Sequence, residues 1–189
     1  MSILILGLIV FFAFHLVPFT PLKATLHERF GEVPYKMAFS ALSLIGLGLI
    51  VWGFLLSRAG PADADLVYYP PESLRHVTNL LVLIGFISLA ASWHKGRLKI
   101  WLRNPMSIGI ALWALGHLLS NGQKSHVLLF GSFLVYALID IAYNTAKGNK
   151  PDYAPKPIHD LIAVAAGAIL FVVFAFGFHP YILNLPVFY

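Results

Sequence analysis

Three ionisable side chains lie inside long apolar stretches of the sequence: His15, His117 and Asp140. An ionisable group at the centre of a membrane helix costs about 2.5–3.5 kcal/mol, so such groups usually face the interior of a bundle or a functional cavity. Imidazole nitrogens are common axial ligands of haem iron, and helix bundles build cofactor sites from side chains on facing helices. The two histidines are therefore candidates for a shared metal centre.

Helical rise places the two histidines at similar depths. At about 1.5 Å per residue, His15 lies roughly 18 Å from an outer start near Ile3, and His117 lies roughly 15 Å from an inner start near Ser107. Because the two helices would cross a core of about 30 Å in opposite directions, their depths differ by only about 3 Å. We predict that His15 and His117 face each other near the midplane and hold a haem iron. The alternative is that each histidine only hydrogen-bonds to a neighbouring helix.

The predicted helix that carries His117 also carries candidate pocket residues. Trp113, His117 and Asn121 recur at intervals of four residues and therefore share one face. Gly109 and Gly116 lie nearby and would let another helix or a flat ring approach closely. The pattern predicts a pocket wall, and plain helix packing is the alternative explanation of the small residues.

Asp140 lies about 21 Å along its predicted helix from His126, in the inner third of the membrane. Its carboxylate would either orient a ligand histidine through that histidine's second ring nitrogen or pair with Arg103 at the membrane boundary. We favour the ion pair, because this depth is close to the interface. The remaining histidines lie at the ends of apolar stretches or in loops and need no special role: His27, His76, His94, His126, His159 and His179.

The composition excludes a soluble protein. The chain has 189 residues, of which 59% are hydrophobic and 11% are charged. Soluble domains are usually about 45–50% apolar and about 25% charged. The absence of Cys excludes disulfides, iron–sulfur clusters and thiolate zinc sites. The sequence also lacks the Walker, HExxH, GxSxG and Rossmann motifs of soluble-type nucleotide and hydrolase chemistry.

Six apolar segments are long enough to approach or reach the roughly 20 residues that a membrane helix needs. Each is apolar around its whole circumference, which indicates helices rather than barrel strands. The predicted spans are 2–19, 37–57, 74–93, 106–122, 126–144 and 161–179. We therefore predict an all-α, polytopic membrane bundle with six transmembrane helices, folded as a single domain over residues 1–189.

Lysine and arginine are distributed unevenly among the loops. In membrane proteins the more basic loops face the cytoplasm. Ten of the 13 basic residues fall in the first, third and fifth loops: Lys23, Arg29, Lys36, Lys95, Arg97, Lys99, Arg103, Lys147, Lys150 and Lys156. This asymmetry arises only if all six segments cross the bilayer. It predicts both termini on the outer side, and it explains the positive charge without nucleic-acid binding.

Two stretches resemble a known family. The first is FFAFHLVPF, continued by LKATLHERFGEVPYKMAFSALSLIGLGLIVWGF, and the second is RNPMSIGIALWALGHLLSNGQKSHVLLFGSFLVYALID. Together they resemble the NnrU family of bacterial membrane proteins, and the WALGHLLSNG block with LLFGSF is the most specific part. Plant and cyanobacterial 15-cis-zeta-carotene isomerase is similar to the same family.

The resemblance implies a multi-pass protein of the bacterial inner membrane. Bacterial members are named for a requirement in nitrite and nitric oxide reductase expression or function. The isomerase branch implies a haem b enzyme that turns a central 15-cis double bond of an apolar polyene to trans. Carried over, histidine ligation of that haem falls on His15 and His117. The family commonly has His-Pro where this chain reads Asn104-Pro105, so a role for that histidine does not transfer.

Two other functions fit parts of the sequence. RNPMSIG also resembles a segment of isoprenylcysteine carboxyl methyltransferase-type enzymes, which bind S-adenosylmethionine at a Pro-initiated helix. Those enzymes continue into a cytoplasmic stretch with paired glutamates, whereas residues 145–160 contain no Glu, so we favour the haem protein. A non-enzymatic assembly or redox-partner subunit of a respiratory complex is the third hypothesis.

Overall fold

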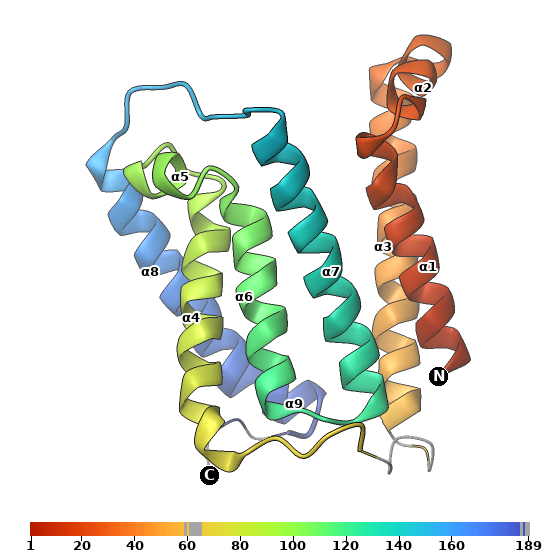
Figure 1. Ribbon diagram of the computed structural model, residues 1–189, viewed down its shortest axis with the longest axis vertical. Helices are drawn as coiled ribbons and strands as arrows, with labels where there is room; N and C mark the ends of the chain where they lie inside the picture. Colours follow the sequence, from red (N-terminus) through yellow and green to blue (C-terminus); the bar gives the residue numbers. More distant parts are fainter. Residues whose placement is uncertain (59, 61–65, 186, 188–189) are drawn as a thin grey trace. The chain divides into compact units, whose positions relative to one another are not determined.

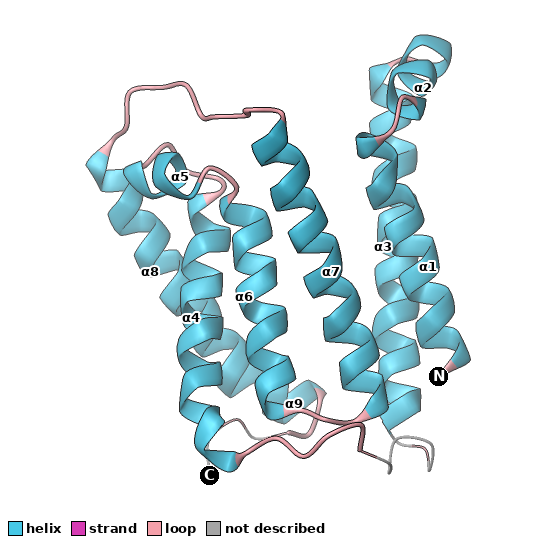
Figure 2. Cartoon of the chain, in the orientation of Figure 1, coloured by secondary structure: helices cyan, strands magenta, loops and turns pink. Residues whose placement is uncertain are grey.

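The computed structural model describes residues 1–58, 60, 66–185 and 187 (Figure 1). The described residues form helices joined by loops and turns, with no strand among them (Figure 2), so the all-α prediction is confirmed. The chain divides into two compact units: unit 1 contains residues 1–67 and 123–129, and unit 2 contains residues 68–122 and 130–189. Parts of residues 59–73 and of the C-terminal residues 180–189 lie outside the described residues.

Five of the described helical segments are long and apolar enough to cross a membrane: Ser2–Phe19, Glu32–Arg58, Glu72–Ala91, Lys124–Ala146 and Pro157–Ile182. The sixth predicted span, 106–122, forms a shorter apolar helix, α6 (Pro105–Ser120). Its 16 residues are about 24 Å long, less than the hydrocarbon core of a typical bilayer. The helix is short because Pro105 begins it and the chain becomes extended at Asn121. The described residues therefore contain five helices that are long and apolar enough to cross a membrane and one shorter apolar helix. The membrane-helix prediction is confirmed, but the count of six full-length spans is not.

Unit 1 is built on two helices packed against each other through glycines. Its described helical elements are α1 (Ser2–Leu16), η1 (Val17–Phe19), α2 (Leu22–Phe30), α3 (Glu32–Arg58) and the first residues of α7 (Lys124–Ala146). A Cβ on Gly53 would lie 2.3 Å from the backbone nitrogen of Leu4, and one on Gly46 would lie 2.9 Å from Cα of Phe11. The pairing of early α1 with late α3 shows that the two helices are antiparallel. Gly46 and Gly53 therefore allow the backbones of α1 and α3 to approach closely.

A short helix occupies the first basic loop, where the sequence suggested only a connection. This helix, α2, begins after Pro21 and ends at Gly31, whose φ of 84° lies in the left-handed region that favours glycine. No residue of α2 is buried. Its nine residues mix charged, polar and apolar side chains, and they are too few for the long apolar pattern that identified the spans.

Unit 2 has α4 in contact with two other helices, α6 and α8 (Figure 1). Its described helical elements, besides the rest of α7, are η3 (Glu72–Leu74), α4 (Arg75–Ala91), α5 (Arg97–Leu102), α6, α8 (Pro157–Val173), η4 (Phe174–Phe178) and α9 (His179–Ile182). A Cβ on Gly85 of α4 would lie 2.9 Å from the carbonyl oxygen of Gly109, and one on Gly167 of α8 would lie 2.4 Å from Cα of Ile87. Small residues thus bring both partner helices onto the α4 backbone.

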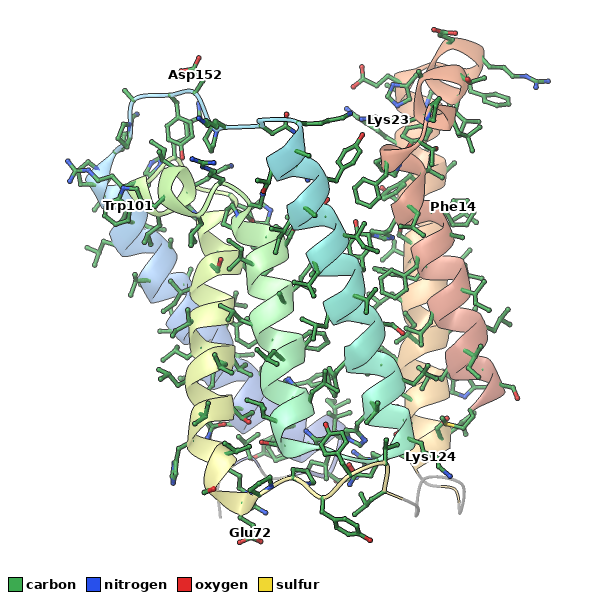
Figure 3. The ribbon with its side chains drawn as sticks, in the orientation of Figure 1. Phe14, Lys23, Glu72, Trp101, Lys124 and Asp152 are labelled. Carbon is green, nitrogen blue, oxygen red and sulfur yellow. The ribbon has the colours of Figure 1, made fainter. Side chains whose placement is uncertain are left out.

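Two of the predicted basic loops meet at one end of unit 2. The backbone N–H of Lys156 donates to the carbonyl of Lys95 at 2.9 Å, and the Tyr153 hydroxyl donates to the carbonyl of Gly96 at 2.9 Å. Burial, and secondarily the charge of Asp160, raises the pKa of Tyr153. Figure 3 shows Trp101 and Asp152 at this end of unit 2 and Glu72 at the opposite end. Loops on one side of a membrane are expected to meet in this way. The predicted placement of both termini on the outer side stays a prediction.

A single carboxylate joins the loop before α5 to the start of α8. Asp160 accepts hydrogen bonds from the backbone N–H groups of Arg97 and Leu98, each at 2.9 Å. A Cβ on Gly96 would lie 2.0 Å from an oxygen of this carboxylate. Gly96 is therefore needed for Asp160 to reach the backbone.

Replacing Asp160 with asparagine is expected to loosen this connection. An amide has one acceptor oxygen and an NH₂ group, so the variant can accept from only one of the two N–H groups and loses the negative charge. We expect trypsin to cleave the variant at Lys95, Arg97 or Lys99 about fivefold faster than the wild type. This figure allows for the solvent exposure of the Asp160 hydrogen bonds, which weakens them. Limited proteolysis in detergent, read by mass spectrometry, measures the rate.

The matched control for this experiment is Asp152→Asn, at an exposed carboxylate in the neighbouring loop. Equal cleavage rates for the two variants would contradict the connecting role of Asp160.

Candidate functional site

His117 lies in the last turn of α6 and is half-buried. Its Nδ1 donates to the backbone carbonyl of Trp113 at 2.8 Å. Because a carbonyl oxygen only accepts hydrogen bonds, Nδ1 carries a proton, and in the neutral ring the lone pair belongs to Nε2. The four-residue spacing between Trp113 and His117 thus fixes the tautomer in which Nε2 has the lone pair that a metal would need.

Aromatic rings surround His117. The Phe130 ring stacks on it with centroids 4.3 Å apart and planes 22° apart, and the Trp113 ring centroid lies 5.2 Å away. Trp113 also meets Phe130 and Phe133 edge to face, with centroids 5.0 and 5.6 Å apart. His117 is therefore held in an apolar, aromatic environment, as a ligand of a flat hydrophobic cofactor would need to be.

Three of the candidate pocket residues of this segment serve the helix itself or its packing. Asn121 Nδ2 donates to the carbonyl of His117 at 2.8 Å, and so satisfies a carbonyl at the end of the helix. The glycine face packs against α4: Gly109 meets the backbone of Gly85, and the carbonyl of Gly116 accepts from the Thr78 hydroxyl at 2.9 Å. Of the two explanations for the small residues, helix packing is correct.

Asp140 has different partners from those predicted. Its carboxylate accepts from the Ser107 hydroxyl and, at 3.0 Å, from Asn144 Nδ2. It pairs with neither Arg103 nor a histidine. Arg103 is exposed and has a φ of 61°, at the turn between α5 and α6. The predicted ion pair with Arg103 is wrong. Arg103 lies in the turn before α6, whereas Ser107 lies in the first turn of α6 and donates to the carboxylate.

Asn104 lies at the other end of α6 from His117. The helix separates these residues by about 20 Å. The carbonyl of Asn104 accepts from the N–H of Ile108 at 3.0 Å and its own N–H donates to the carbonyl of Leu102 at 2.7 Å. Asn104 is therefore the first residue of the α6 hydrogen-bond ladder and does not share a pocket with His117.

His15 lies in the last turn of α1, in unit 1. Its Nδ1 donates to the carbonyl of Phe11 at 2.8 Å, so its neutral ring also has its lone pair on Nε2. The ring stacks on Phe11 with centroids 3.9 Å apart and lies 5.1 Å from the Phe39 centroid. His15 thus has the same local arrangement as His117. Because the two histidines belong to different units, their predicted meeting at the midplane stays a prediction.

Two histidines that the sequence left without a role have defined environments. His126, in the unit 1 part of α7, is only 5% exposed and meets Phe54 edge to face with centroids 4.9 Å apart. His179, at the start of α9, lies beside His117 with ring centroids 6.1 Å apart and planes 20° apart. The sequence did not mark His126 and His179 as candidate site residues, because histidines at the ends of apolar segments usually lie at the membrane interface.

The donor atoms fit a metal centre with two imidazole ligands better than a larger cluster. Among the described residues there is no group of three or more His, Cys, Asp or Glu that could hold a metal ion. Haem iron needs only two axial ligands from the protein, since the porphyrin supplies the other four. His15, His117 and His179 all donate from Nδ1 to a carbonyl of their own helical segment, which leaves the lone pair of each neutral ring on Nε2.

Comparison with known families decides the identity of the chain. The family model described as NnrU protein matches residues 3–187. The chain is a member of the NnrU family. No match was found among curated proteins or among solved structures. The NnrU match runs through both units, and its range includes the positions of His15, His117 and His179.

Proposed function

We propose that this NnrU protein binds haem b within the bacterial inner membrane, with Nε2 of His15 and Nε2 of His117 as the axial ligands. The observation that carries the proposal is the shared arrangement of the two histidines. Each lies in the last turn of an apolar helix, donates from Nδ1 to the carbonyl four residues earlier, and stacks on a phenylalanine. Such a hydrogen bond fixes the ring and raises the basicity of the ligating nitrogen.

When bound, haem iron supplies Lewis-acid or one-electron redox chemistry. The residues of the chain contribute binding and exclusion of water. Trp113, Phe130 and Phe133 form an aromatic surface beside His117 that suits a porphyrin or an apolar polyene. The function we propose is a haem-dependent role in nitrite and nitric oxide respiration, or cis-to-trans isomerisation of a carotenoid-like polyene.

The absorption spectrum of the purified protein tests the cofactor. We expect protein expressed with ample haem and purified in detergent to show a Soret band and the sharp visible bands of low-spin, bis-imidazole haem. The pyridine haemochrome should identify haem b at about one per chain. A well-folded preparation without Soret absorbance would overturn the proposal.

Two assays separate the proposed roles. Incubation of the haem-loaded protein with a 15-cis polyene, followed by chromatography, detects the trans isomer if the protein is an isomerase. Deletion of the gene in a denitrifying host abolishes nitrite or nitric oxide reduction if the role is respiratory. A protein that has neither effect and co-purifies with a respiratory complex would instead be an assembly subunit.

A further inference from the structure

His179 and His117 come together from helical segments far apart in the sequence. His117 ends α6, whereas His179 follows the last apolar helix, and both belong to unit 2. Their ring centroids are 6.1 Å apart and their planes differ by 20°. Both side chains are half-buried. The two imidazoles are thus brought together by the fold of a single compact unit.

The separation of the rings matches the separation across one metal atom. A histidine nitrogen binds a transition metal at about 2.0–2.1 Å, and the ring centroid lies roughly 1.1 Å behind that nitrogen, so each centroid is about 3.2 Å from the metal. Two imidazoles on opposite sides of one atom therefore have centroids up to about 6.4 Å apart. The observed 6.1 Å lies just inside this limit. Near-parallel ring planes are compatible with two ligands that point toward each other along one axis.

The protonation of both rings also suits ligation. His179 Nδ1 donates to the carbonyl of Phe174 at 2.8 Å, as His117 Nδ1 does to that of Trp113. Each Nδ1 therefore carries a proton, and Nε2 is the atom with the lone pair in both neutral rings. A histidine ligand in proteins usually has its second nitrogen held by such a carbonyl or carboxylate.

The backbone that leads to His179 is unusual. Residues Phe174–Phe178 form a π-helical turn between α8 and α9. The carbonyl of Phe174 accepts both the backbone N–H and the Nδ1 of His179, five residues later. His15, His94 and His117 instead donate to the carbonyl four residues earlier. Single π-turns are rare in proteins, and those that occur are often found at functional sites. The extra residue rotates the ring away from the direction that a continuous α-helix would give it.

We propose that His179 and His117 bind one first-row transition-metal centre through Nε2 of each ring. The ligand role of His117 in this inference rests on the proposed function, and His179 is the added residue. Two imidazole nitrogens can bind either the iron of a haem or a bare divalent metal ion. If the metal is haem iron, His179 would hold it together with His117, in the place that the proposed function gives to His15.

Spin state and metal affinity test this inference on the full chain in detergent. The variants are His179→Ala, His179→Gln and His15→Ala, with His76→Ala as the control at an exposed histidine of α4. The glutamine variant retains an amide N–H that can donate to the Phe174 carbonyl, so it separates loss of the imidazole from loss of the fold. Size-exclusion profiles confirm that each variant is folded. Absorption and electron paramagnetic resonance report the spin state of ferric haem, and titration of the haem-free protein with Co²⁺ reports bare-metal binding.

We expect both His179 variants to change ferric haem from low spin to high spin while His15→Ala and His76→Ala remain low spin. If the metal is a bare ion, both His179 variants instead bind Co²⁺ about 10-fold or more weakly, because even the loss of an outer partner of a ligand costs that much. Low-spin haem and unchanged Co²⁺ affinity in both His179 variants would overturn the inference. Should His15→Ala alone become high spin, the proposed function stands without His179. If the wild-type protein binds no haem, and both His179 variants bind Co²⁺ more weakly than the wild type does, only the proposed function is overturned.

Discussion

Replacing His117 with alanine is expected to remove bound haem almost completely. His117 belongs to both imidazole pairs, with His15 in the proposed function and with His179 in unit 2, so no alternative pairing compensates for its loss. The variant loses the ligating Nε2 and the ring that stacks on Phe130 with centroids 4.3 Å apart. We expect less than about a tenth of the wild-type haem content, with the remainder high spin, because loss of a direct ligand costs at least as much as the 10–100-fold seen for its outer partners.

Haem content per chain and the spin state measure this effect. His94→Ala is the matched control, because His94 also donates from Nδ1 to the carbonyl four residues earlier, Ala90, but lies just beyond α4. A His117→Gly variant adds a rescue arm, since imidazole in the buffer can occupy the vacated space and restore the low-spin spectrum. Wild-type spectra in His117→Ala would contradict the assignment of His117 as a ligand.

Gly53→Val in α3 is expected to destabilise unit 1 strongly. The first added carbon would already lie 2.3 Å from the backbone nitrogen of Leu4 and 2.6 Å from its Cα. Backbone atoms cannot move aside as a flexible side chain can, so α1 and α3 must separate. Overpacking of this kind costs about 1–3 kcal/mol and sometimes more. At about 2–4 °C per kcal/mol for a chain of this size, we expect Tm to fall by roughly 10 °C.

Gly48→Val is the matched control for this prediction, in the same helix. A Cβ on Gly48 meets no atom within 4 Å, so Tm should change little. Thermal unfolding in detergent, followed by circular dichroism, compares the two variants. Equal Tm values would show that α1 and α3 do not pack through Gly53.

Most of the fold was predictable from the sequence because apolar segments of about 20 residues have few alternatives in a membrane. The predicted run 37–57 is part of the longer α3, since the preceding residues 32–36, which include the charged Glu32 and Lys36, belong to the same helix. The helices α2 and α5 were missed, because their nine and six residues give no full apolar period. The short length of α6 was also missed, since hydropathy alone does not locate the extended residue Asn121 that ends it.

The candidate site was predictable only where it depends on spacing within one helix. The contact of Trp113 with His117 follows from their four-residue separation. The partner of Asp140 depends on how two helices meet, and local hydropathy gave no reason to prefer Ser107 over Arg103. His179 was missed for a further reason. The π-turn before it breaks the 3.6-residue period on which every face assignment rests.

The carboxylate of Asp160 has a consequence at the far end of its own helix. Through Arg97 and Leu98 it fixes the start of α8 against the loop that follows α4. His179 lies 19 residues later in the same apolar segment. A helix fixed at one end cannot shift along its axis relative to the helix beside it. The contacts of Asp160 therefore help to set the position of the His179 ring along α6. A change in the loop that Asp160 contacts is therefore expected to shift the His179 ring relative to His117 at the other end of unit 2.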